Sequence, residues 1–107
     1  MPATDPRLLR LARLAAMQRD LHLSQLASAQ AALDASLRQR EALEPPPCSD
    51  PDPMLQIADL QHQIWAEGRC RILAGQIAAR QAERDERRRI AALATGRCNV
   101  IERMFGK

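Results

Sequence analysis

Large apolar residues recur along the second half of the chain at steps of three and four. This spacing places them on one face of a helix and, sustained over several heptads, predicts a coiled coil. The predicted seam of the second half consists of Ile57, Leu60, Ile64, Gly68, Ile72, Gly75, Ala79, Ala82, Glu86, Ile90, Leu93, Arg97, Val100 and Met104. The first half carries a broader leucine stripe: Leu8, Leu11, Leu14, Leu21, Leu26, Leu33, Leu37 and Leu43.

Prolines separate the two stripes. Each proline lacks a backbone N–H and restricts the residue before it, so the cluster Pro45, Pro46, Pro47, Pro51 and Pro53 excludes helix and strand. Asp5-Pro6 and Asp52-Pro53 are each typical of an N-cap followed by the first helical residue. We therefore predict an all-α fold for residues 1–107: a long antiparallel two-helix coiled-coil hairpin. Its parts are a helix at 6–44, a Pro-rich turn at 45–53 and a helix at 54–105.

A turn centred near residue 49 predicts the register of the hairpin. Leu37 then pairs with Leu60, Leu33 with Ile64, Leu26 with Ile72 and Leu21 with Ile77. Gly68 and Gly75 fall on the predicted seam, where they indicate a close approach of the two backbones or, alternatively, a hinge. Residues from about Ala92 onward have no partner in this register. That segment is still amphipathic and therefore predicts a protein-docking surface, made of Leu93, Val100, Ile101, Met104 and Phe105.

Composition argues against an enzyme. The chain has one Trp, one Phe and no Tyr, although 46% of its residues are hydrophobic. Without bulky aromatics a compact core with a deep pocket is not expected. His22 and His62 do not converge, the glycines form no phosphate-binding loop, and Ser24, Ser28 and Ser36 have no nearby base. We expect no catalytic residues, no metal and no cofactor.

Charge is segregated along the chain. The net charge is +3, but residues 41–67 hold six acids and neither Lys nor Arg. In the predicted register the arginine-rich run 80–89 faces the N-terminal arginines, so one end of the hairpin becomes basic. The residues of this predicted basic end are Arg7, Arg10, Arg13, Arg80, Arg84, Arg87, Arg88 and Arg89. A hairpin with opposite charge at its ends can be oriented by a partner of uneven charge.

The cysteines and the hydropathy bear on the compartment. Cys48, Cys70 and Cys98 are odd in number and lack CxxC spacing, so a reducing cytoplasm is expected. Cys48 falls in the predicted turn and lacks a nearby cation that would activate it. No apolar run reaches the length of about 20 residues that spans a bilayer, so membrane insertion is not expected.

The chain resembles the flagellar export protein family FliJ and its type III secretion counterparts. The resemblance covers nearly the whole chain and is mainly architectural. At the level of residues it rests on the opening Arg7-Leu-Leu-Arg-Leu-Ala-Arg13 and on the late run 89–103. It implies a non-catalytic coiled-coil partner of the export ATPase that also bridges to the export gate or handles export chaperones. The chain is shorter than typical members, and its Pro-rich turn stands where they have longer arms.

These observations predict a non-enzymatic coiled-coil adaptor of an export apparatus. Two alternatives stay open. One is an oligomeric helical-hairpin nucleic-acid binder, which the absence of aromatics among the arginines disfavours. The other is a structural subunit that associates with itself, for which Leu55, Leu73 and Ile77 offer a second apolar face.

Overall fold

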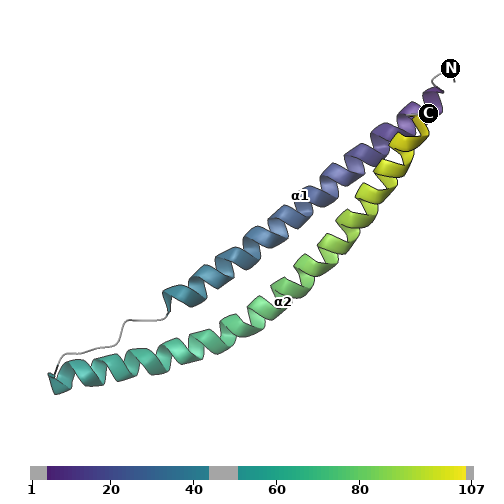
Figure 1. The fold of residues 1–107 in the computed structure, drawn as a ribbon. Coiled ribbons are helices and arrows are strands. Elements are labelled where there is room, and N and C mark those ends of the chain that lie inside the picture. The colour runs from purple at the N-terminus through teal and green to yellow at the C-terminus, as the bar shows by residue number, and fades with distance from the viewer. Residues whose placement is uncertain (1–4, 44–50, 106–107) are drawn as a thin grey trace. The chain divides into compact units, whose positions relative to one another are not determined.

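Two helices make up the fold. A computed structural model describes residues 5–43 and 51–105, and every element in these ranges is helical (Figure 1). Helix α1 spans Pro6–Ala42 and helix α2 spans Pro53–Phe105. The chain is an all-α helical hairpin, as the apolar spacing predicts. Most of the predicted turn, including Cys48, lies outside the described residues.

Both helices begin with the same cap. The N–H of Arg7 donates to Oδ1 of Asp5 at 2.9 Å, and the N–H of Met54 donates to Oδ1 of Asp52 at 3.0 Å. The carbonyls of Asp5 and Asp52 accept the first intrahelical hydrogen bonds, at 3.1 and 3.0 Å. A helix leaves its first N–H groups without intrahelical partners, and the aspartates satisfy one in each helix. Two Asp-Pro pairs therefore set both helix starts, as the sequence predicts.

Contacts divide the chain into two units. Unit 1 contains residues 1–30 and 82–107, and unit 2 contains residues 31–81. In each unit a segment of α1 packs against a segment of α2. In unit 1 the start of α1 (purple) lies beside the end of α2 (yellow) (Figure 1). The two segments run antiparallel, because Arg19 contacts Cys98 and Glu102 whereas Gln25, later in α1, contacts the earlier Arg87.

The observed seam follows a strict heptad spacing. In unit 1, apart from the adjacent Ala16, Gln25, Gln30, Ile90 and Thr95, the buried and half-buried positions alternate in steps of four and three along both helices. On α1 they are Leu8, Ala12, Ala15, Arg19, His22, Leu26 and Ala29, and on α2 they are Arg84, Arg87, Ala91, Ala94, Cys98, Ile101 and Phe105. In unit 2 the α2 positions Ala66, Cys70, Leu73, Ile77 and Arg80 continue the spacing. This alternation is the repeat of a coiled coil.

Unit 2 holds a cluster of buried aliphatic side chains. Leu33 of α1, 2% exposed, packs with Leu73, 1% exposed, and with Ile77 of α2. Leu37 and Leu43 pack against this cluster. The predicted pairing of Leu33 with Ile64 is therefore wrong. Its actual partners lie about three helical turns further along α2.

The predicted seam of α2 is also wrong. Ile57, Leu60, Ile64, Ile72, Leu93, Val100 and Met104 are all exposed, as are Leu11, Leu14 and Leu21 of α1. The observed seam contains alanine, cysteine and arginine beside its few large aliphatics. Small seam residues let two helices pack closely, so the chain buries its small residues and exposes many of its larger ones.

The glycines do not mark a close approach. A Cβ built at Gly68, Gly75 or Gly96 has no neighbouring atom within 4 Å. All three residues are exposed, and α2 continues through them as an unbroken helix. Counted from the seam, each lies at the heptad position furthest from α1. The close-approach interpretation is wrong, and the hinge alternative stays a prediction.

Candidate protein-docking surface

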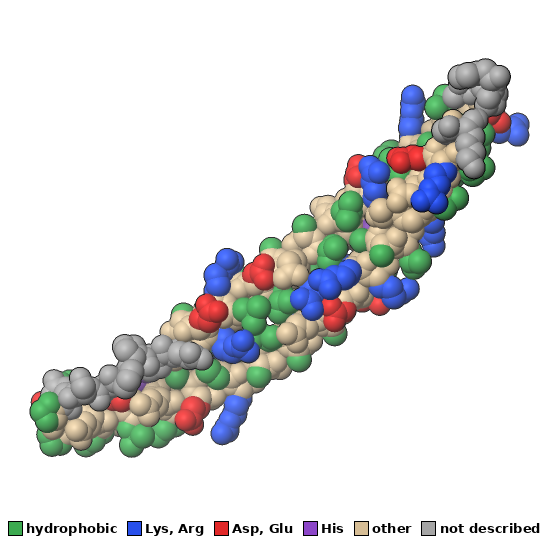
Figure 2. Space-filling view, viewed as in Figure 1, with side chains coloured by type: hydrophobic (Ala, Val, Ile, Leu, Met, Phe, Trp, Pro, Cys, Tyr) green, Lys and Arg blue, Asp and Glu red, His purple; other side chains and the backbone are tan. Residues whose placement is uncertain are grey.

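Six of the nine large apolar side chains that the described part of unit 1 exposes lie on one flank of its helix pair. On α1 they are Leu11, Leu14 and Leu21, and on α2 they are Leu93, Val100 and Met104. Counted from the seam, all six occupy the heptad positions that flank the same side in an antiparallel pair. We call this set the outer apolar face. Hydrophobic side chains are visible among the charged ones on the surface in view (Figure 2).

A shallow hollow lies beside this face on α2. It is lined by Ala92, Leu93, Gly96, Arg97, Val100 and Ile101. Gly96 has no side chain to fill the space, and its neighbours Leu93 and Val100 are respectively 50% and 56% exposed. An apolar side chain from another protein can enter here without displacing any side chain at Gly96. The hollow is therefore a natural anchor point on the outer apolar face.

The predicted docking residues divide between two faces of α2. Leu93, Val100 and Met104 are exposed, whereas Ile101 and Phe105 are half-buried on the seam. The docking role of these five residues stays a prediction. The prediction that residues from about Ala92 onward lack a partner is wrong, because the end of α2 packs against α1. Arg19 of α1 contacts Cys98 and Glu102, and Cys98 is 1% exposed.

A cluster of polar side chains lies at the seam near the end of α2. Nη1 of Arg19 donates to Sγ of Cys98 at 3.4 Å and lies 3.9 Å from Oε1 of Glu102. The Cys98 thiol donates to the same Glu102 oxygen at 3.6 Å. Nε of Arg19 also donates to Oδ1 of Asp20 at 3.1 Å. The pKa of Arg19 is raised, first by the hydrogen bond to Asp20 and then by Cys98, so this guanidinium keeps its charge.

Arginines also occupy the middle of the seam in unit 1. Nη1 of Arg87 donates to Oε1 of Gln25 at 3.1 Å, and Nδ1 of His22 lies 3.4 Å from the same oxygen. Because an amide oxygen only accepts hydrogen bonds, this contact requires the proton on Nδ1 of His22. Arg84 is half-buried and pairs with Asp85. Polar groups at seam positions favour one register at some cost in stability.

The predicted basic end does not form one cluster. Arg87 lies beside Gln25, which is five helical turns beyond Arg7 on α1. Arg7, Arg10, Arg13 and Arg88 are exposed, whereas Arg84 and Arg87 contribute to the seam. Arg89 donates to Glu86 at 2.6 Å, which lowers the pKa of Glu86 and raises that of Arg89. Arg80 belongs to unit 2, where its Nε is buried without a hydrogen-bond partner.

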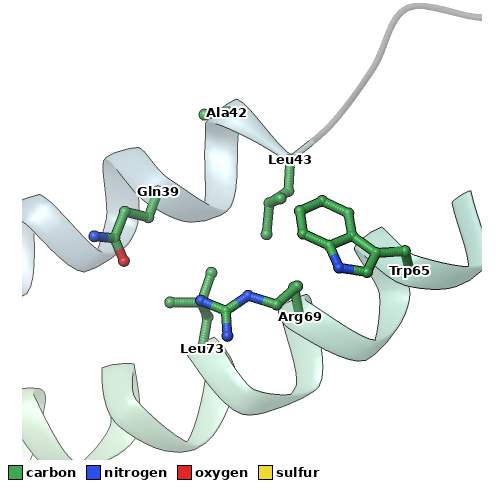
Figure 3. Close-up of a pocket in the computed structure, with 6 residues that line it drawn as sticks. All are labelled: Gln39, Ala42, Leu43, Trp65, Arg69 and Leu73. Atoms are coloured by element: carbon green, nitrogen blue, oxygen red, sulfur yellow. The ribbon is translucent and has the colours of Figure 1, made fainter. Parts of the chain in front are cut away.

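A second exposed surface lies at the start of α2, in unit 2. Leu43 at the end of α1 points toward Trp65 and Leu73, and Arg69 lies between these two α2 residues (Figure 3). The residues of α2 before Trp65 thus extend beyond the end of α1. The segment 53–65 is exposed at every position except Asp59. The overhanging helix end is the start of α2 and not its last turns.

No group of three or more His, Cys, Asp and Glu side chains in the described residues is placed to hold a metal ion. The rings of His62 and Trp65 are tilted by 36° with their centroids 5.6 Å apart, on the exposed start of α2. Cys70 and Cys98 are free thiols, and Cys98 is buried in the seam.

Comparison with family models, curated proteins and solved structures finds no match. The architecture and its surfaces therefore carry the functional argument. Neither described helix is long and apolar enough to cross a membrane. The sequence does not predict Leu11, Leu14 and Leu21 as surface residues, because leucines at this spacing suit a buried stripe and an exposed one equally well.

Proposed function

We propose that the chain is a non-enzymatic helical-hairpin adaptor that binds a protein partner through the outer apolar face of unit 1. The observation that carries the proposal is the exposure of Leu93, Val100 and Met104 on a helix whose seam positions are already buried against α1. A helix that has satisfied one apolar face and exposes another typically docks against a second protein.

The resemblance to the FliJ family supplies a specific candidate for this partner. We propose the cytoplasmic export ATPase of a flagellar or type III secretion apparatus, or a component of its export gate. Two features support this choice. The helical hairpin resembles the architecture of that family, and the segments that build the outer apolar face hold more arginines than acids, with Arg97 lining its hollow. A basic rim around an apolar centre favours an acidic rim on the partner.

Binding to the purified export ATPase tests the proposal. Val100→Asp places a charge on the outer apolar face, and Asn99→Asp places the same charge on the neighbouring exposed residue outside it. We expect Val100→Asp to weaken the complex at least about tenfold, since a buried unpaired charge is costly, and Asn99→Asp to leave it unchanged. Both variants are exposed substitutions, and their helix content can be checked by circular dichroism.

Two outcomes would contradict the proposal. Equal binding by both variants would show that the outer apolar face is not the docking surface. Binding to RNA or DNA that weakens steeply with salt, without any protein complex, would instead support the nucleic-acid alternative.

A further inference from the structure

The start of α2 carries an acidic apolar stripe. Ile57, Leu60, Ile64 and Glu67 follow one another at steps of three, four and three, and all four are exposed. Between residues 51 and 67 the charged residues are Asp52, Asp59 and Glu67, with no Lys or Arg. An amphipathic helical stripe of this spacing is the form in which a helix enters an apolar groove.

No part of α1 in unit 2 covers this stripe. Leu43, which directly follows the end of α1, lies toward Trp65 and Leu73 (Figure 3). Ile57 and Leu60 are each 56% exposed and lie further toward the start of α2. The helix is nevertheless capped and continuous from Pro53, so its stripe is formed before any partner arrives.

The outer apolar face of unit 1 has the complementary character. The segments that build it, residues 7–21 and 93–104, contain Arg7, Arg10, Arg13, Arg19, Arg97 and Arg103 against only Asp20 and Glu102, and both of these acids pair with Arg19. Leu11, Leu14, Leu93, Val100 and Met104 supply exposed apolar surface, and a shallow hollow lies at Gly96. The chain thus carries one acidic apolar surface and one basic apolar surface, on different units.

We propose that a second copy of this chain covers the acidic apolar stripe, by presenting the outer apolar face of its unit 1. Opposite charges align the two surfaces, whereas pairing two stripes or two outer faces brings like charges together. The contact joins two different surfaces. In a closed dimer it forms twice, and in an open filament each copy makes it once with each neighbour. The inference rests on the proposed function, because it uses the same outer apolar face.

Charge reversal in the full-length chain tests the pairing. One variant carries Asp59→Arg with Glu67→Arg, and another carries Arg10→Glu with Arg97→Glu. Sedimentation equilibrium of the wild type, from low micromolar to millimolar concentration, is expected to show association that weakens with salt. Each variant alone is expected to associate at least about tenfold more weakly, because its two surfaces then carry like charges. An equimolar mixture of the two variants is expected to associate again, since each reversed surface meets a reversed partner.

A matched control reverses two exposed arginines outside both surfaces, Arg38→Glu with Arg88→Glu, and is expected to associate as the wild type does. A wild type that stays monomeric, or a mixture that associates no better than its components, would overturn the inference. The acid-reversed variant also separates the two proposals. It should lose self-association but still bind the export ATPase, whereas Val100→Asp should lose both.

Discussion

The Arg19 guanidinium of α1 donates a hydrogen bond to the Cys98 thiol of α2 at 3.4 Å. This contact places the last turns of α2 beside α1 and places Cys98 in the seam, where it is 1% exposed. That register places Ala91, Ala94 and Cys98 in the seam of unit 1. It also leaves Leu93 and Val100 on the outside.

Thiol labelling checks the register in unit 1. With Cys48 and Cys70 replaced by Ser, Cys98 is expected to react with a maleimide only when the helices separate locally. We expect this rate to be at least about tenfold below that of Cys70, measured with Cys48 and Cys98 replaced instead, because Cys70 is only half-buried. If Cys98 reacts as fast as it does in the unfolded chain, the end of α2 has no partner, as in the register predicted from a turn centred near residue 49.

The exposed glycines predict an increase in stability. Gly68→Ala and Gly75→Ala each add a Cβ that meets nothing within 4 Å, in the middle of a continuous helix. Glycine costs about 1 kcal/mol relative to alanine in a helix interior, so each substitution should raise the free energy of unfolding by about that amount. Thermal or urea unfolding followed by circular dichroism measures the change. A loss of stability would mean that these positions need a bend that alanine resists.

The first cap predicts a loss of stability. Asp5→Ala removes the oxygen that accepts the N–H of Arg7 and should lower the free energy of unfolding by about 1 kcal/mol. Asp5→Asn keeps an acceptor oxygen at the same place and should cost less. If the two variants unfold alike at a lower temperature than the wild type, the charge of Asp5 matters and the hydrogen bond does not.

Sequence reasoning predicted those features that local chemistry determines. The Asp-Pro pairs and the proline cluster locate both helix starts, because caps and missing N–H groups act within a few residues. The choice of buried face depends instead on how α2 lies along α1. Leu33 suits Ile64 as well as it suits Leu73, since each pairing matches one aliphatic side chain with another. A turn centred near residue 49 predicts the wrong pairing, that of Leu33 with Ile64.

The candidate site shows the same division. Leu93, Val100 and Met104 stand out in the sequence because they keep helical spacing to the end of the chain, and they are exposed. Their α1 neighbours on the outer apolar face, Leu11, Leu14 and Leu21, look like core residues until the seam is known. The seam itself carries Arg84 and Arg87, which a search for apolar stripes passes over. The burial of the seam positions and the contacts of Arg87 with Gln25 and of Arg19 with Cys98 reveal it.

The central claim concerns which face of α2 is buried. The seam, made mostly of small residues with a few large ones, packs against α1, and the stripe of large apolar residues predicted as the seam is exposed. Ile72 and Leu73 are adjacent in unit 2, yet they are 53% and 1% exposed. The most direct measurement is therefore the thermal unfolding of Ile72→Glu and Leu73→Glu, followed by circular dichroism. We predict that Ile72→Glu changes the free energy of unfolding by no more than about 0.5 kcal/mol, because an exposed glutamate is well tolerated in a helix. Leu73→Glu should unfold the hairpin or cost it 3 kcal/mol or more, roughly the penalty of an unpaired buried charge. A stable Leu73→Glu together with an unfolded Ile72→Glu would contradict the account.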